Sequence, residues 1–321
     1  MSISIEGRAA TRLQVETLAS HFPRFARQFG DRAIVLLRAD MVGNSGAFKE
    51  YGVREVVEEL KQQGHVSVST SSMGSQMLAV VSAAAEHHMC AEISATHLLP
   101  AEKEARAWAI WEQYGRSPDK LRIYKTGIAF EEAVAFGDRH FDPTTFIHPF
   151  NDARLLAHRE QIFHDAIYSY PEVQHVVSPS GGASLSAALA RAALDTHVLT
   201  YVSEAPGSNS LSNSLRAREV TAADSPNPKY GGSAVRYMGS LAFDIFSNVP
   251  NMLSRIVTAP EHTVGQLARE YAANEPEVPM EPTALVAVAG LEALARDIPE
   301  DEPIGVIVTG HNESYTKILA A

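Results

Sequence analysis

For most of its length the sequence alternates between apolar stretches of strand length and amphipathic stretches of helix length. In the first half the strand-like stretches are residues 33–39, 65–70, 90–95 and 121–125, and the helix-like stretches are 51–62, 76–88, 101–114 and 128–140. A helix between two strands returns the chain to the edge where the first strand began, so the two strands become parallel. The alternation therefore predicts an α/β protein with mostly parallel sheets that are flanked by helices.

A proline-containing segment, residues 143–149, interrupts this alternation and predicts a crossing between two domains. Beyond it we expect a long helix over residues 153–170. The strand-like stretches that follow are 175–178, 197–203, 253–259 and 303–310, and the helix-like ones are 185–194, 263–273 and 282–296. Residues 206–232 are rich in Ser, Asn, Pro and Gly, and we expect loop with short helices there.

Charge and cysteine content argue against several classes of protein. The 27 basic and 38 acidic residues give a net charge of −11, whereas a nucleic-acid-binding surface needs a basic stripe. No uncharged apolar run is long enough to cross a bilayer, so we expect no membrane partner. The single cysteine, Cys90, leaves no internal disulfide framework, which favours a cytoplasmic location.

Lys49 is the first candidate for chemistry, because it follows the turn Gly43-Asn44-Ser45-Gly46 and precedes a predicted helix. A lysine that is held in a cleft loses hydration, which lowers the pKa of its amine and makes it nucleophilic enough to form a Schiff base. Taken alone, a solvated lysine at the start of a helix is the commoner explanation. The position therefore needs support from other parts of the chain.

Three further segments that follow predicted strands offer binding groups. The small residues of 178–184 let backbone N–H groups approach a phosphate at a helix N-terminus. The hydroxyl-rich run 70–76 suits a carboxylate for the same reason, and Thr309 offers a hydroxyl to a ring nitrogen. Each segment also has a plain structural explanation: a tight turn, a serine-rich helix cap and a polar strand end, respectively.

Together, and in this order, the four segments resemble the fold-type II enzymes that use pyridoxal 5′-phosphate (PLP), the superfamily of tryptophan synthase β and threonine dehydratase. Residues 44–49 resemble the motif of the family's Schiff-base lysine, 70–76 align without a gap with its substrate-carboxylate loop, and 179–184 resemble its glycine-rich phosphate loop. Residues 148–152 are similar to the threonine-dehydratase branch, whereas 309–311 lean toward threonine synthase. The resemblance covers nearly the whole chain.

The resemblance implies two domains with the cofactor in the cleft between them. The larger, PLP-binding domain would comprise residues 1–50 and 146–321, and the smaller domain, 51–145, would carry the substrate loop. Lys49 would be the catalytic residue. The implied cofactor-binding residues are Lys49, Gly74, Gln76, Ser180, Gly181, Gly182, Ala183, Ser184 and Thr309, and the implied substrate-binding residues are Ser71, Ser72, Met73 and Ser75.

Several positions depart from the family pattern. Met73 and Gly74 stand where the family has Gly-Asn, so the asparagine beside the cofactor's 3′-oxygen is missing and Met73 adds bulk near the substrate carboxylate. Gln76 or a water molecule could replace the lost contact. Ala183 and Ser184 replace two glycines of the phosphate loop. The changes in the substrate loop affect the expected substrate more than the expected cofactor.

The resemblance implies a PLP-dependent lyase of amino-acid metabolism, of the threonine or serine dehydratase type. Such an enzyme eliminates the β-hydroxyl of an amino acid and yields a keto acid and ammonia. Two alternatives stay open: a β- or γ-replacement enzyme similar to threonine or cysteine synthase, and a PLP-fold protein without activity. Glu281 is the one candidate for holding a cation, and a surface glutamate before a proline is equally expected. Family members are commonly homodimers, so the resemblance implies a homodimer here.

Overall fold

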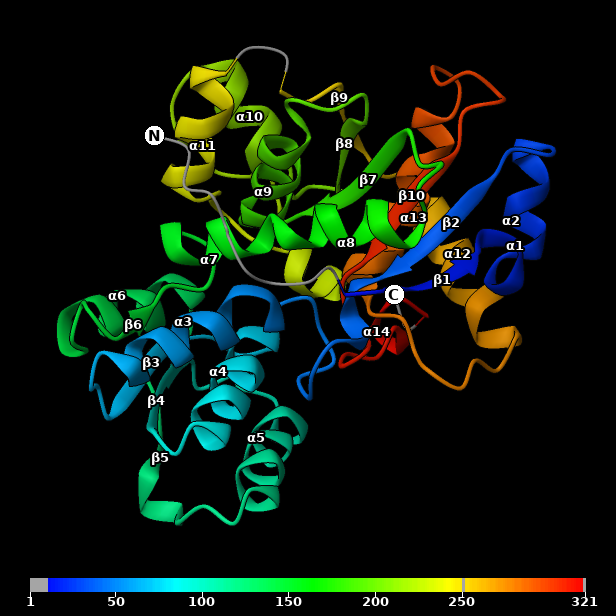
Figure 1. Ribbon diagram of the computed structural model, residues 1–321. Coiled ribbons are helices and arrows are strands. Elements are labelled where there is room, and N and C mark those ends of the chain that lie inside the picture. Colours follow the sequence, from blue (N-terminus) through cyan, green and yellow to red (C-terminus); the bar gives the residue numbers. More distant parts are fainter. Residues whose placement is uncertain (1–10, 250–251, 320–321) are drawn as a thin grey trace.

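The computed structural model describes residues 11–249 and 252–319, and it contains two separate sheets. The strand order is β1-β2-β10-β7-β8-β9 in the six-stranded sheet and β5-β4-β3-β6 in the four-stranded sheet. Figure 1 shows the smaller sheet in the lower part of the molecule, with its own helices around it. The predicted α/β class with two mostly parallel, helix-flanked sheets is confirmed.

The six-stranded sheet combines the start of the chain with its second half. Its strands are β1 (Gln14–Thr17), β2 (Ile34–Arg38), β7 (His175–Ser180), β8 (Leu199–Glu204), β9 (Arg255–Thr258) and β10 (Ile304–Val308). All neighbouring pairs are parallel except β1 and β2, which are antiparallel. β1 was not expected from the sequence, since the first strand-like stretch begins at residue 33.

Both faces of this sheet are covered by helices. Ile34 and Leu36 of β2 pack in one core with α12 (Glu261–Ala273) and α13 (Pro282–Leu294). Val35 and Leu37 pack in another core with α8 (Gln161–Ser169) and α9 (Ser184–Ala193). Because successive side chains of a strand point to opposite faces, a strand between two helical layers is apolar throughout, which is the pattern that β2 shows.

The four-stranded sheet is parallel throughout. Its strands are β3 (Ser67–Ser71), β4 (Cys90–Ala95), β5 (Leu121–Lys125) and β6 (Phe146–Ile147). Its helices are α3 (Glu50–Gln62), α4 (Ser75–Glu86), α5 (Ala101–Gln113) and α6 (Phe130–His140). The apolar faces of α3, α4 and α5 share one core with β3 and β4, and Trp111 of α5 is fully buried in it.

The long helix expected over residues 153–170 is two helices, α7 (Ala153–Arg159) and α8, separated by a turn at Glu160. The loop-rich region 206–232 contains the short helix α10 (Ser210–Ala217), as expected. The remaining helices are α1 (Leu18–His21), α2 (Pro23–Ala26), α11 (Ser240–Asn248) and α14 (Thr316–Leu319), with 3-10 turns at 27–29, 39–41, 118–120 and 228–233.

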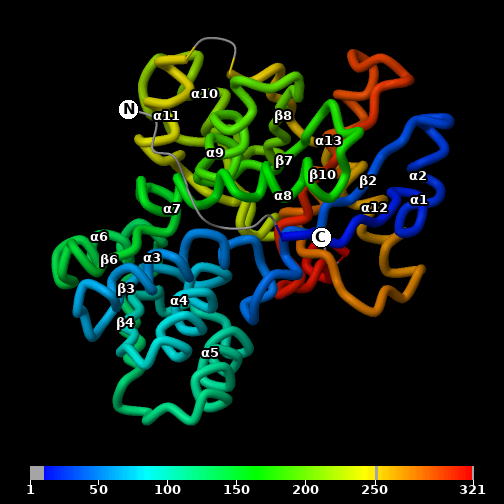
Figure 2. Tube along the Cα trace, viewed as in Figure 1, coloured from blue at the N-terminus to red at the C-terminus, as the bar shows by residue number. Residues whose placement is uncertain are grey.

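Figure 2 traces the path that links the two sheets: the chain leaves the larger sheet after β2, completes the smaller one, and returns through α7. The division into domains at residues 50 and 146 stays a prediction. Within the described ranges, no helix is long and apolar enough to cross a membrane.

Candidate active site

The four segments singled out in the sequence all follow the carboxyl ends of parallel strands. Lys49 lies beyond β2, the 70–76 loop ends β3, Ser180 ends β7 and Thr309 follows β10. Since β2, β10 and β7 are neighbours in one sheet, their following segments meet at a single edge. A cleft at the carboxyl ends of the strands is the usual place for a ligand in α/β proteins.

The Lys49 turn is bound directly to the segment after β10. The backbone N–H of Phe48 donates to the carbonyl of Thr309 at 2.9 Å, and the N–H of His311 donates to the carbonyl of Gly46 at 2.9 Å. The side-chain amide of Asn312 donates to the carbonyl of Ser45 at 2.9 Å. These bonds hold the lysine turn against the end of the last strand.

The side chain of Lys49 is partly buried, and its Nζ atom has two neighbours. Its Nζ donates to the carbonyl of Pro149 at 2.9 Å and lies 5.0 Å from the centre of the Phe48 ring. Burial holds the pKa of Lys49 well below its usual value, and the nearby Arg159 lowers it further, while Glu281 opposes the shift. An amine in this setting is available as a base or nucleophile near neutral pH.

The first turn of α3 is irregular, and this is what separates Lys49 from the helix proper. Tyr51 has an extended backbone conformation and Gly52 has a φ of +91°. A side chain on Gly52 would also crowd the backbone of Leu155, to 3.0 Å from its carbonyl oxygen. Regular helix therefore begins after Gly52, and Lys49 lies on a turn rather than on a helical face.

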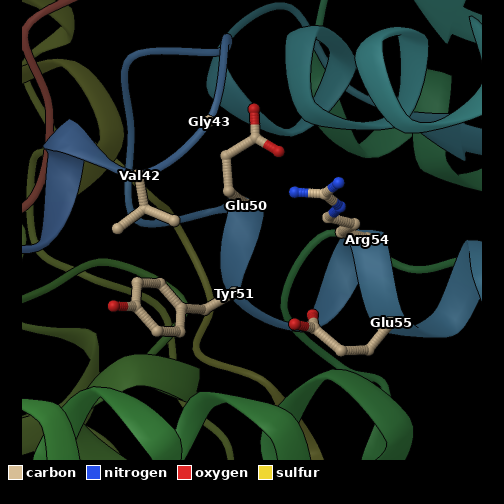
Figure 3. A pocket seen from close by; sticks show the side chains of 6 residues that line it. All are labelled: Val42, Gly43, Glu50, Tyr51, Arg54 and Glu55. Atoms are coloured by element: carbon tan, nitrogen blue, oxygen red, sulfur yellow. The ribbon is translucent and has the colours of Figure 1, made fainter. Parts of the chain in front are cut away.

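Glu50 stabilises the same turn through a hydrogen bond to its backbone. Its carboxylate accepts the backbone N–H of Ser45 at 2.7 Å, and burial raises its pKa. Figure 3 shows Glu50 and Arg54 extending into a small pocket that is also lined by Val42 and Tyr51. Lys49 is not among the residues that line this pocket, so the pocket is separate from the lysine side chain.

The segment between β7 and α9, residues 180–184, has a shape that suits an anion, and we call it the anion cradle. A side chain on Gly181 would overlap the carbonyl oxygen of Gly232, and one on Gly182 would overlap the ring of Phe150. Ala183 has a left-handed backbone conformation with φ of +63°, which turns the chain into the N-terminus of α9. The buried hydroxyl of Ser180 has no hydrogen-bond partner. Free N–H groups and an unpartnered hydroxyl at a helix N-terminus suit a phosphate group.

The predicted substrate residues of the 70–76 loop divide into two groups. Ser71 is fully buried, and its hydroxyl bonds to Ser94 at 2.7 Å and to the carbonyl of Ala133 at 3.1 Å, so it joins β3 to β4 and α6. The sulfur of Met73 accepts from the hydroxyl of Thr96 at 2.6 Å and packs against the core of the smaller sheet. Both side chains are therefore engaged within that sheet's own layer.

Two other members of the loop, Ser75 and Gln76, contact residues outside the smaller sheet's layer. Ser75 and Asn312 are hydrogen-bonded at 3.1 Å, which joins the loop to the segment after β10. Ser72 accepts the backbone N–H of Gly74 at 3.1 Å. Gln76 accepts from Arg159 at 3.3 Å, and its own amide nitrogen is buried without a partner. The structure thus brings Ser75 and Gln76 to the predicted site.

Sequence reasoning missed two cations beside this loop. The ammonium of Lys103, on α5, would lie 3.4 Å from a Cβ on Gly74, and it forms an ion pair with Glu313 at 3.1 Å. Arg159, the last residue of α7, is fully buried and donates to Ser184 at 2.6 Å. Neither residue belongs to a local motif, because each reaches the site from a distant helix.

Thr309 and Glu281 form a buried, hydrogen-bonded pair after β10 and at the start of α13. The hydroxyl of Thr309 donates to Glu281 at 2.7 Å, and both residues are buried. Burial raises the pKa of Glu281 to about 7. Among the described residues, no group of three or more His, Cys, Asp or Glu side chains is placed to hold a metal ion, and Glu281 has no such companions.

A two-sheet α/β fold with a desolvated lysine and an anion cradle at one edge defines a class of enzymes that hold a phosphorylated cofactor through a lysine. Residues 11–310 match the family described as pyridoxal-phosphate-dependent enzyme. The chain belongs to this family, and PLP is its cofactor.

Known proteins agree with this assignment. The chain is 22% identical to L-threonine ammonia-lyase of Thermotoga maritima over 283 residues, which cover 87% of this chain and 67% of that protein. Its fold is similar to that of threonine deaminase isoform 2 from Solanum lycopersicum, with a TM-score of 0.80, 20% identity and coverage of 97% and 82% of the two chains. Maize serine racemase gives a TM-score of 0.79, 19% identity and coverage of 97% and 91%.

The residues present fit this cofactor. The cradle of Gly181 and Gly182 and the unpartnered hydroxyl of Ser180 match its phosphate, while the desolvated amine of Lys49 matches its aldehyde. Ser184 replaces a family glycine, and its hydroxyl accepts a hydrogen bond from Arg159.

Proposed function

We propose that the chain is a PLP-dependent amino-acid lyase that removes the β-hydroxyl of a serine- or threonine-like substrate and yields a keto acid and ammonia. The observation that carries the proposal is the partly buried amine of Lys49, which lies against the Phe48 ring together with Arg159, the residue that donates to Ser184 and Gln76. The similarity to an L-threonine ammonia-lyase supports the same type of reaction.

Lys49 is the proposed covalent anchor of the cofactor and the base of the reaction. PLP, when bound, supplies an electron sink for the negative charge that develops at the substrate Cα. With the cofactor in place, the amine of Lys49 would accept the Cα proton of the substrate. Its lowered pKa favours the unprotonated form of the amine that this role requires. The proton that Lys49 takes up would balance the loss of the β-hydroxyl as water, and hydrolysis of the product enamine by water would give the keto acid and ammonia.

The remaining roles follow from position. We assign Ser180 to Ser184 to the cofactor phosphate, Gly74 and Gln76 to the edge of the cofactor ring, and Thr309 to its ring nitrogen. An uncharged hydroxyl leaves that nitrogen unprotonated, which favours elimination over transamination. Ser72 and Ser75 are the groups of the 70–76 loop that we assign to the substrate carboxylate, with the N-terminus of α4 beside them.

Two proposals concern organisation. We place the domain boundaries at residues 50 and 146, next to the points where the chain leaves the six-stranded sheet after β2 and where, at β6, it forms the last strand of the four-stranded sheet before α7. We also propose a homodimer in the cytoplasm. The molar mass of the purified protein in solution tests the dimer: twice the chain mass of 34.8 kDa is expected, and a mass of one chain would contradict it.

Absorption spectra of the purified holoenzyme test the proposed reaction. We expect a cofactor band above 400 nm, typical of PLP joined to a lysine, that is lost in Lys49→Ala and kept in Lys61→Ala, an exposed lysine of α3. Addition of serine and threonine should change the wild-type band and release keto acid without a second substrate. Keto-acid release only with an added nucleophile would indicate a replacement enzyme. Interconversion of enantiomers without keto acid would indicate a racemase, and both outcomes would contradict the lyase proposal.

A further inference from the structure

Arg159 is a fully buried cation inside the proposed cofactor site. Its side chain leaves the end of α7 and ends between the two sheets. One terminal nitrogen donates to Ser184 at 2.6 Å and the other to Gln76 at 3.3 Å. The Nε atom of the guanidinium is buried and has no hydrogen-bond partner. The group is therefore only partly satisfied by the protein.

No carboxylate among the described residues forms an ion pair with Arg159. The other fully buried arginine, Arg38, shows the contrast, because it pairs with Asp40 at 2.8 Å and with Glu16 at 3.3 Å. Burial lowers the pKa of Arg159 to about 10, whereas the pKa of Arg38 is raised. Taking a cation out of water is unfavourable without an anion beside it. The site around Arg159 is therefore incomplete until an anion binds.

The surroundings of Arg159 indicate which anion that is. Its shorter contact is with Ser184, the first residue of α9, at the mouth of the anion cradle. The unpartnered hydroxyl of Ser180 belongs to the same cradle. Arg159 and Lys49 both lie against the ring of Phe48, at 5.5 Å and 5.0 Å from its centre. The guanidinium thus borders the space between the proposed cofactor lysine and the proposed phosphate loop.

We propose that Arg159 is the counter-ion of the cofactor's phosphate, and that it supplies a positive charge that backbone N–H groups alone do not provide. The planar fork of a guanidinium matches the geometry of a phosphate, and it can bond to the phosphate and to Ser184 together. The proposal rests on the assignment of residues 180–184 as the phosphate loop. It adds to that assignment a charged residue from α7.

Binding of two cofactor forms to the full chain, stripped of cofactor, tests this role without measuring activity. PLP carries the phosphate, and pyridoxal has the same ring and aldehyde without it. Arg159→Gln removes the charge and keeps a side chain able to bond to Ser184. We expect this variant to bind PLP about 10- to 100-fold more weakly and pyridoxal within about threefold of wild type. Arg159→Lys should restore most of the preference for PLP, and Arg216→Met, an exposed arginine of α10, should leave it unchanged.

An unchanged ratio of PLP to pyridoxal affinity in Arg159→Gln would overturn the proposal. If that ratio holds while the spectral response to amino acids with acidic side chains is lost, Arg159 serves a substrate anion instead, which also overturns it. If Arg159→Gln does not fold, Arg159→Met takes its place: inorganic phosphate should raise the melting temperatures of cofactor-free wild type and Arg159→Lys more than that of Arg159→Met, and equal shifts in all three would contradict the role. Equal binding of PLP and pyridoxal by wild type would instead show that the phosphate-loop assignment itself fails.

Discussion

The hydroxyl of Thr309 donates a 2.7 Å hydrogen bond to Glu281, a carboxyl group that is buried and whose pKa burial raises to about 7. Such a carboxyl is protonated in the folded protein at pH values where it is ionised in the unfolded chain. The segment that carries Thr309 also holds the Lys49 turn, through the bond from the Phe48 N–H. The protonation state of Glu281 is thus coupled to the geometry of the proposed cofactor site.

Glu281 predicts a defined pH dependence of stability. The folded-state pKa is above the unfolded value of 4.5, so the stabilising contribution is full below pH 4.5 and is lost as the pH rises through about 7. The shift corresponds to about 3 kcal/mol in the free energy of unfolding. Urea unfolding from pH 5 to 8 should therefore show a smaller decline in Glu281→Gln than in wild type. Glu300→Gln, at an exposed position, is the matched control, and parallel curves for all three proteins would contradict the prediction.

Gly181→Ala should weaken both folding and cofactor binding, because the added methyl group would overlap the carbonyl oxygen of Gly232. We expect a loss of about 1–3 kcal/mol in the free energy of unfolding, as is typical of overpacking. Gly265→Ala on α12 is the control, since the nearest atom to its new methyl group is 3.6 Å away and alanine favours a helix. Thermal unfolding and PLP titration check both variants. Wild-type affinity and stability in Gly181→Ala would show that the cradle is wider than described.

Arg38→Met should be strongly destabilising. It would leave the buried carboxylate of Asp40 with only His311, which lies 2.8 Å away, as an ionisable partner. Breaking a buried ion pair in this way costs about 3–5 kcal/mol. Arg191→Met, which removes an exposed pair with Glu160, should change stability little. Equilibrium unfolding in urea compares the two variants, and similar small losses in both would argue against an ionised Asp40.

Lys103→Met tests whether the ion pair with Glu313 joins the smaller sheet's helices to the segment after β10. The Lys103–Glu313 pair is largely buried, but Glu313 also has Lys317 as a partner, at 3.1 Å, so the expected loss of stability is about 1–3 kcal/mol. The variant should also loosen the 70–76 loop locally, because the ammonium of Lys103 lies beside Gly74. Amide hydrogen exchange of residues 70–76 should become faster in the variant. Unchanged exchange would contradict this role.

The sequence was sufficient to predict the class of fold, because apolar periodicity marks strands and helices. The same pattern placed Lys49, Thr309 and the 180–184 loop after strands whose carboxyl ends meet at one edge. Their proposed roles came from the resemblance to the PLP enzymes, since each segment alone also has a plain structural explanation.

Arg159 and Lys103 could not be found in the same way. The pattern over 153–170 indicated one continuous helix, whereas the turn at Glu160 ends α7 at Arg159 and leaves its side chain in the site. Its partners, Gln76 and Ser184, are distant in the sequence. Contacts of this kind depend on how α7, α4 and α9 pack, and no local pattern encodes that packing. The engagement of Met73 by Thr96 is a second example.

Chemical trapping of the cofactor tests the central claim, that Lys49 carries PLP, most directly. Treatment of the holoenzyme with borohydride converts a lysine-linked cofactor into a stable amine, and peptide mass spectrometry then locates it. We expect the phosphopyridoxyl mass on the peptide that contains Lys49, and not on Lys103, a buried lysine beside Gly74. Finding the cofactor on Lys103 or another lysine, with Lys49 unmodified, would contradict it.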